Sequence, residues 1–171
     1  MEIVSLKKFL PLILTFNIVL IDQITKLAIL SHIPLKSIGA SFFGDFLRII
    51  HVRNPGIAFS IGKDLPDPFR TLLFTVFPFL ILAGVGIHFF RNNQYTPFQR
   101  WMVAGILGGG VGNLIDRIFR PEGVIDFIDV KIYGFLGMER WPTFNIADSA
   151  VVVCGIGIAC SLIFKGRTTH E

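Results

Sequence analysis

Long apolar runs alternate with shorter polar segments along the whole chain. Residues 38–63 are rich in strand-forming side chains and contain the turn signal Asn54-Pro55-Gly56. A helix needs about 20 apolar residues to cross the hydrocarbon core of a bilayer. Four runs reach that length: 9–30, 71–90, 98–117 and 144–164. The pattern predicts a mainly α integral membrane protein, a four-transmembrane-helix bundle with a small extracytoplasmic β-sheet, as a single membrane domain over residues 1–171.

Composition narrows the class further. The apolar share of the 171 residues is 52%, only 16% are charged, and the mean hydropathy is +0.65. This composition excludes an ordinary soluble domain. The net charge of +4 suits anionic lipid headgroups. We therefore expect membrane lipids as partners, and no nucleic acid, since no motif for one is present.

The first apolar run could belong to a secretory leader, because Lys7 and Lys8 precede it. However, no small-x-small cleavage site follows Ile21, so we expect a retained span.

Basic residues indicate the orientation of the spans, because short cytoplasmic loops are enriched in lysine and arginine. They gather in three segments on one side of the predicted bundle: Lys7 and Lys8, Arg91 and Arg100, Lys165 and Arg167. Both termini are therefore predicted to face the cytoplasm.

Several charged side chains lie inside the predicted spans, where each is costly and suggests a function. With a rise of about 1.5 Å per residue, Asp22 and Asp116 lie about 20 Å and about 22 Å from the inner edge. Span four runs the other way, which puts Asp148 about 6 Å below the outer edge. All three converge on the outer third of the membrane. Their polar neighbours at this depth are Lys26, Asn113, Asp126 and Asn145.

Some of these residues fit a purely structural role. Asp22 and Lys26, one helical turn apart, fit an ion pair that only holds helices together. We interpret Asp116 with Arg117 in the same way, unless Arg117 extends outward to the interface. Asn113 and Asn145 suit hydrogen bonds between helices. The glycines at 108–110 and 112 predict a close approach of the third span to a neighbour.

Asp126 and Asp148 fit a structural role less well, because neither has a basic partner one turn away. Two nearby carboxyl groups cannot both ionise easily, so they share a proton. One acid and one base suffice to activate water and protonate a leaving amine. With four histidines and no paired ligand spacing, we expect neither a metal nor a cofactor.

Three alternatives remain open at this point. A small proton-coupled membrane transporter would also bury carboxylates, although one shared depth gives no track across the bilayer. A non-enzymatic assembly factor would use the cluster only for stability. A different intramembrane aspartyl protease would place both aspartates within helices, whereas Asp126 lies just beyond a span.

Five motifs, in order, resemble the lipoprotein signal peptidase (signal peptidase II) family across nearly the whole chain. They are Asp22-Gln-x-x-Lys26, Asn54-x-Gly56-x-Ala58-Phe59-Ser60, Gly112-Asn113-x-x-Asp116-Arg117, Val124-x-Asp126-Phe127 and Phe144-Asn145-x-Ala147-Asp148-Ser149. The resemblance implies an aspartic-type peptidase that removes signal peptides from diacylglyceryl-modified bacterial prolipoproteins, cutting before the lipidated cysteine. It implies a monomer in the bacterial cytoplasmic (inner) membrane with its active site near the outer face.

The resemblance also implies roles for single residues. Asp126 and Asp148 correspond to the family's catalytic pair. Residues implied to line the substrate site are Asn54, Gly56, Asn113, Arg117 and Asn145. Residues implied to support the site are Asp22, Lys26 and Asp116.

Overall fold

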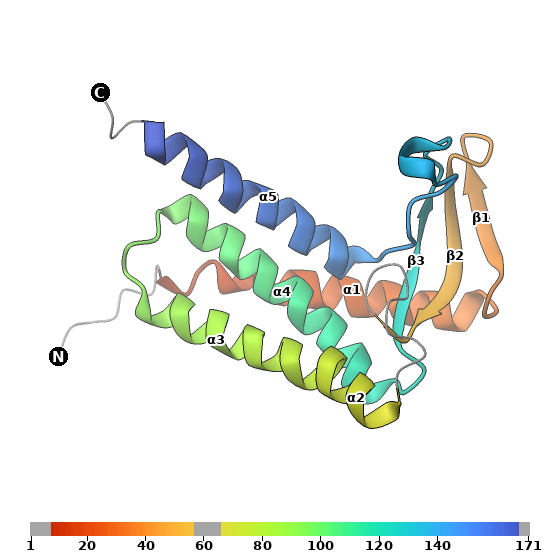
Figure 1. Ribbon diagram of the computed structural model, residues 1–171, viewed down its shortest axis with the longest axis horizontal. Coiled ribbons are helices and arrows are strands. Elements are labelled where there is room, and N and C mark those ends of the chain that lie inside the picture. Colours follow the sequence, from red (N-terminus) through yellow and green to blue (C-terminus); the bar gives the residue numbers. More distant parts are fainter. Residues whose placement is uncertain (1–7, 57–65, 168–171) are drawn as a thin grey trace.

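The computed structural model describes residues 8–56 and 66–167, with the backbone alone at Asp67 and at 165–167. Long helices run back and forth along one direction, and a three-stranded sheet lies across one end of them (Figure 1). The helices are α1 (Leu12–His32), α2 (Asp67–Thr71), α3 (Phe77–Arg91), α4 (Pro97–Phe119) and α5 (Ile146–Arg167). The strands are β1 (Ile38–Phe42), β2 (Leu47–Asn54) and β3 (Val124–Val130). The predicted fold class, four helical spans with a small sheet, is confirmed.

Four helices are long and apolar enough to cross a membrane: Leu12–His32, Pro68–Arg91, Pro97–Phe119 and Ile146–Phe164. The second joins α2 to α3 through a π-helical turn over Leu72–Val76. Each end lies within three residues of the bounds expected from hydropathy. The start of α1 and the end of α5 lie at the same end of the bundle, opposite the sheet (Figure 1).

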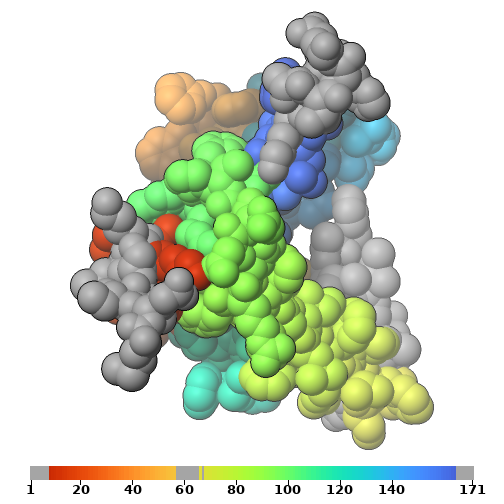
Figure 2. All heavy atoms as spheres, turned by 90° about the vertical axis from the view of Figure 1, so that its left-hand side faces the viewer, coloured from red at the N-terminus to blue at the C-terminus, as the bar shows by residue number. Residues whose placement is uncertain are grey.

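Helix α4 is the centre of the bundle and contacts α1, α3 and α5. Seen end-on from the side opposite the sheet, its green atoms lie between the red atoms of α1 and the blue atoms of α5 (Figure 2). Many large apolar side chains on the other helices are exposed, among them Phe16, Phe79 and Val153. In a membrane these faces contact lipid, which explains why apolar surface is left uncovered.

Glycine allows the close approach of α4 to α5. A Cβ atom on Gly109 would lie 2.3 Å from the carbonyl oxygen of Ala147 and 2.7 Å from Cγ2 of Val151. A Cβ on Gly112 would lie 2.8 Å from Oδ2 of Asp22 on α1. Both distances are too short for a side chain, so the predicted close packing at these glycines is confirmed.

The sheet has the order β1-β2-β3, with both pairs antiparallel. Strands were expected only between the first two spans, and β1 and β2 are found there; residues 57–63 of the expected β-rich segment lie outside the described residues. Strand β3 was not expected, because it comes from the segment after α4. Its register sets Asp126 opposite Val52 and Val124 opposite Asn54. The sheet therefore brings the two outer segments together beside the helix ends.

Candidate active site

Asp148 is held by the start of α5. The amide oxygen of Asn145 accepts the N–H of Asp148 at 2.9 Å, and Oδ2 of Asp148 accepts the N–H of Asn145 at 3.1 Å. This reciprocal pair is a capping box, which satisfies two backbone groups that the first turn of a helix leaves unpaired. The helix start therefore fixes the direction of the Asp148 carboxylate.

Asp126 lies in β3 and is only 2% exposed. Its Oδ2 accepts a hydrogen bond from Nδ2 of Asn54 at 3.0 Å, and its Oδ1 accepts one from Nδ2 of Asn145 at 2.8 Å. Asn145 thus contacts both aspartates: its Nδ2 donates to Asp126, and its backbone N–H donates to Asp148. Asn113 on α4 completes the link, since its Nδ2 donates to Oδ1 of Asp148 at 2.7 Å.

Burial raises the pKa of Asp126 to about 7 from its ordinary value of 3.8, and the charge of Asp148 adds to the rise. The hydrogen bonds from Asn54 and Asn145 and the charge of Lys26 act in the opposite direction. A carboxyl group with this pKa is partly protonated at neutral pH. It is able to give or take a proton there, as acid–base catalysis requires.

The turn that follows β2 lies next to Asp126. Oδ1 of Asn54 accepts the N–H of Gly56 at 3.1 Å, which closes the turn after β2. Nη2 of Arg117 donates to the carbonyl oxygen of Gly56 at 3.0 Å, and its guanidinium lies 5.7 Å from the ring centroid of Phe74. Arg117 therefore joins the end of α4 to this turn. Ala58, Phe59 and Ser60 of the same motif lie outside the described residues.

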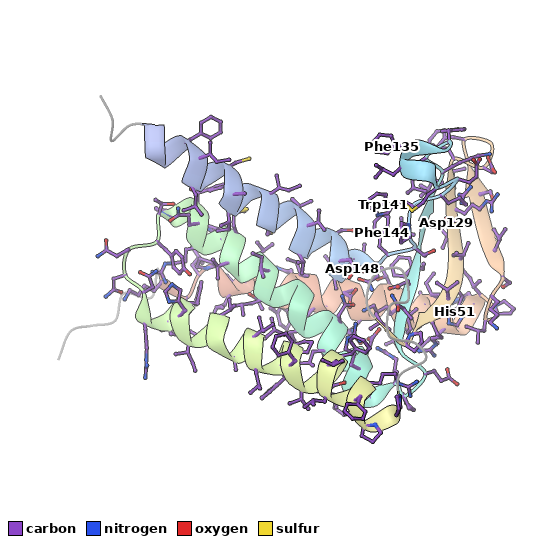
Figure 3. All side chains as sticks on the ribbon, viewed as in Figure 1. His51, Asp129, Phe135, Trp141, Phe144 and Asp148 are labelled. Atoms are coloured by element: carbon purple, nitrogen blue, oxygen red, sulfur yellow. The ribbon has the colours of Figure 1, made fainter. Side chains whose placement is uncertain are left out.

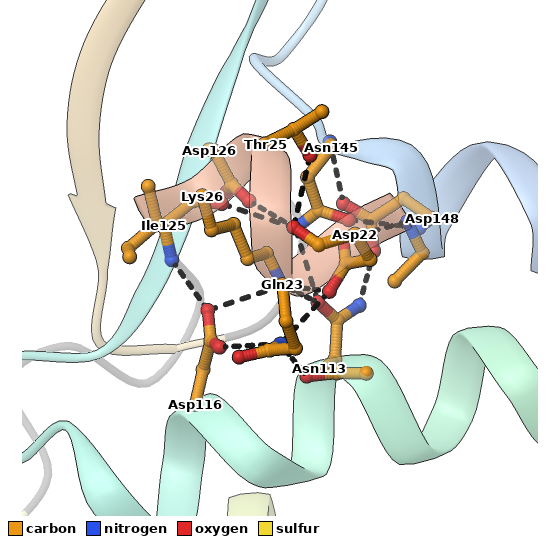
Figure 4. A network of polar contacts seen from close by, with 12 residues as sticks. Asp22, Gln23, Thr25, Lys26, Asn113, Asp116, Ile125, Asp126, Asn145 and Asp148 are labelled. Carbon is orange, nitrogen blue, oxygen red and sulfur yellow. Dashed lines mark hydrogen bonds and ion pairs between the residues drawn. The ribbon is translucent and has the colours of Figure 1, made fainter. Parts of the chain in front are cut away.

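Lys26 is fully buried and lies within the polar network that contains both aspartates (Figure 4). Its Nζ is 2.8 Å from Oδ2 of Asp22 and 3.1 Å from Oδ2 of Asp116. It also donates to Oδ1 of Asn113 at 3.0 Å. An ammonium group has three hydrogens, so each finds an acceptor. These three contacts compensate the ammonium group for the water that it loses on burial.

The sequence assigned the wrong partner to Asp116. Its ion pair on α4 is with Arg120, one turn later, and not with the adjacent Arg117. Successive residues on a helix point about 100° apart, whereas residues four apart share a face. Gln23 was also overlooked: its Nε2 donates to Oδ2 of Asp22 and Oδ1 of Asp116, and its Oε1 accepts from Arg120. The i,i+4 spacing would have identified Arg120.

A cavity of about 710 Å³ opens beside the two aspartates. Its polar lining includes Asn54, Asn113, Arg117, Asp126, Asp148 and Ser149. Its apolar lining includes Val124, Trp141, Pro142, Phe144 and residues 151–153. Trp141 and Phe144 project into the space between the sheet and α5, above Asp148 (Figure 3). The cavity therefore offers two carboxyl groups at one end of a mostly apolar wall.

Of the seven residues predicted to be catalytic or to bind substrate, the structure brings five to this cavity, and two take other places. Asn145 is fully buried and bridges the two aspartates, and Gly56 lies in the turn that Arg117 contacts. Neither is among the described residues that line the cavity. Their contacts orient side chains that do line it. Within the described ranges, no group of three or more His, Cys, Asp and Glu is arranged to hold a metal ion.

A family model, related sequences and solved structures all match this chain over most of its length. A family model described as signal peptidase (SPase) II matches residues 14–164. The chain is 46% identical to the lipoprotein signal peptidase of Treponema pallidum (strain Nichols), over 92% of this chain and 84% of that protein. It is also 46% identical to the lipoprotein signal peptidase of Treponema denticola, over 92% of this chain and 91% of that protein. A solved bacterial membrane enzyme, 29% identical, superimposes with a TM-score of 0.77 over 91% of this chain and 88% of that one.

Proposed function

Because the chain belongs to the signal peptidase II family, we propose that it is an aspartic-type endopeptidase that removes signal peptides from diacylglyceryl-modified bacterial prolipoproteins. The cut falls immediately before the lipidated cysteine. Family membership gives no support to the proton-coupled transporter considered from the sequence. The observation that carries the aspartic mechanism is that Asp126 and Asp148 border one cavity while both contact Asn145.

The proposed chemistry uses one proton shared by the two aspartates. The ionised carboxylate takes a proton from water, and the oxygen attacks the scissile carbonyl carbon. The protonated carboxyl polarises the carbonyl oxygen and then gives its proton to the departing nitrogen as the C–N bond breaks. The products are a signal peptide with a new carboxylate and a lipoprotein whose cysteine amine is free. The pKa of Asp126, about 7, suits either half of this exchange.

The cavity lining suits a substrate that is part peptide and part lipid. Amides of Asn54 and Asn113 lie on its polar side and are able to bind a peptide backbone. Val151, Val152 and Val153 on α5 extend the lining along an apolar helix, where acyl chains find a lipid-like surface. We place the site near the outer face of the bacterial inner membrane, with both termini in the cytoplasm and the chain a monomer surrounded by lipids.

The test compares wild type with Asp126→Asn and Asp148→Asn, each isosteric with the native residue. A purified prolipoprotein, with and without its diacylglyceryl group, is incubated with each enzyme and analysed by gel shift. We expect cleavage of the lipidated precursor by wild type alone. Loss of one member of a catalytic unit typically costs about 10⁴-fold or more in rate. Normal cleavage by either variant, expressed at the level of wild type, would falsify the assignment.

A further inference from the structure

Two buried carboxylates hold the peptide N–H groups that directly precede the two site aspartates. Oδ1 of Asp22 accepts the N–H of Ala147 at 3.0 Å, one residue before Asp148. Oδ2 of Asp116 accepts the N–H of Ile125 at 3.0 Å, one residue before Asp126. Asp22, Asp116, Ala147 and Ile125 are all fully buried. Each contact therefore fixes the backbone from which a site carboxyl group projects.

Lys26 connects these two contacts. Its Nζ lies within 2.8 Å of Asp22 and 3.1 Å of Asp116. The third hydrogen of the ammonium group goes to Asn113, whose own amide donates to Asp148. One cation thus binds both carboxylates and also reaches a direct partner of a site residue.

We propose that Asp22, Lys26 and Asp116 act as one positioning unit that sets the separation between the carboxyl groups of Asp126 and Asp148. This inference rests on the proposed function, because it concerns the geometry of that reaction. Two carboxyl groups that share a water and a proton need a fixed spacing, and a displacement of about 1 Å can cost about 10²-fold in rate. Strand β3 and helix α5 come from separate segments, and this unit ties both to α1.

We expect a change at one member of the unit to disturb the others, because they share hydrogen-bond partners. A carboxylate has two oxygens, so Asp22 accepts both from Ala147 and from Lys26. An asparagine there has one oxygen and must give up one of the two contacts. Losing the ionic contact leaves Lys26 short of a partner in a fully buried position, where an uncompensated charge is costly. At Asp116 a single oxygen, Oδ2, accepts from both Lys26 and Ile125, so an asparagine there weakens both contacts together by removing the charge.

The experiment is a kinetic cycle with a lipidated precursor, using Asp22→Asn, Asp116→Asn and the double variant. For each single variant we expect kcat to fall by about 10²-fold while KM stays within about twofold, because Asp22 and Asp116 are fully buried and are not among the described residues that line the cavity. The double variant should be about as slow as the slower single variant, as for residues that act together. Two losses that multiply, or a loss confined to KM, would overturn the proposal.

Gln99→Met is the matched control for general destabilisation. Gln99 is a buried polar residue on α4 at the end away from the site, where its Nε2 donates to Ser161 at 3.1 Å. This variant should lower the melting temperature without the fall in kcat. If Asp22→Asn does not fold, the cycle of Lys26→Met with Asp116→Asn makes the same prediction of non-multiplying losses.

The outcomes also separate this inference from the proposed function. A wild-type enzyme that leaves the lipidated precursor uncut rejects the proposed function. A wild-type enzyme that cuts it, together with multiplying losses in the cycle, rejects the positioning unit alone.

Discussion

At the scale of single residues, the buried aspartates divide into two kinds by their partners. Asp22 and Asp116 contact Lys26, so their charges are compensated. Among the described residues, the hydrogen-bond donors to Asp126 are the amides of Asn54 and Asn145. An amide stabilises a carboxylate without cancelling its charge. This difference separates residues suited to structure from a residue suited to proton transfer.

The raised pKa of Asp126 predicts an effect on stability that depends on pH. The folded state keeps a proton between pH 3.8 and about 7 that the unfolded state has lost. The favourable contribution of this group is therefore complete below pH 3.8 and disappears as the pH rises to about 7. Asp126→Asn does not titrate and avoids that loss, so its melting temperature relative to that of wild type should be higher at pH 8 than at pH 5. The loss of unfolding free energy in wild type is at most about 4 kcal/mol, of which about 3 kcal/mol falls between pH 5 and about 7.

Melting followed by tryptophan fluorescence in detergent would measure the difference. Asp129→Asn serves as the comparison, because it breaks the ion pair of Asp129 with Arg140 (2.7 Å) and should melt below wild type. An advantage of Asp126→Asn that is equal at both pH values, or smaller at pH 8, would show that burial does not hold the proton on Asp126.

Part of this division could be predicted from the sequence. The spacing of Asp22 and Lys26 indicates a pair on one helix face, and the structure contains it. Residues that meet from different elements could not be paired in this way. The bond between Asp116 and the N–H of Ile125 depends on a turn between α4 and β3 that hydropathy does not describe.

At the scale of elements, α4 was the most predictable in its packing. Its glycines indicate a close neighbour, and the structure shows that neighbour to be α5 at Gly109. Strand β3 was the least predictable. Its seven residues are mostly buried and include two aspartates, so it has no alternation of polar and apolar positions. The strand exists because β2 offers it a partner, and a partner distant in sequence leaves no local signal.

Gly109→Ala tests how closely α4 must approach α5. The new Cβ would lie 2.3 Å from the backbone oxygen of Ala147, which cannot rotate away as a side chain could. Helix α5 must therefore shift at the residue next to Asp148. We expect a loss of about 1–3 kcal/mol in stability and slower cleavage of the lipidated precursor. Thermal melting and initial rates measure the two effects.

Gly84→Ala provides the comparison on α3. A Cβ at that position meets nothing within 4 Å, so the variant should be neutral or slightly stabilised by better helix propensity. If both variants lose the same stability, or if Gly109→Ala keeps full stability and activity, the close approach is not needed.

At the scale of the whole molecule, hydropathy was sufficient to predict four spans, because lipid imposes long apolar helices whatever the function. The bundle leaves its apolar faces uncovered and concentrates polar contacts near the sheet (Figure 4). What hydropathy could not supply is the sheet topology that carries Asp126 back to the helix ends. That placement depends on pairing between residues 70 or more positions apart, such as Asn54 with Val124.

The predicted orientation can be tested at the two ends of α4. Gln94 precedes this helix and Glu122 follows it, and both are exposed. In a background with Cys154 and Cys160 replaced by alanine, Glu122→Cys should react with a membrane-impermeant maleimide added to intact spheroplasts. Gln94→Cys should react only after the membrane is permeabilised, because the basic residues beside that loop predict a cytoplasmic position. Both variants should still cleave the precursor, which shows that the labelled protein is folded.

The same experiment decides on which side the proposed reaction occurs. Glu122 lies in the turn between α4 and β3, at the end of the bundle where the cavity opens, so its labelling reports the side of Asp126. The proposed function places the cut near the outer face of the membrane, so an outward cavity agrees with it. Labelling of Gln94→Cys in intact spheroplasts, with Glu122→Cys protected, would reverse the topology and place both aspartates beside the cytoplasm.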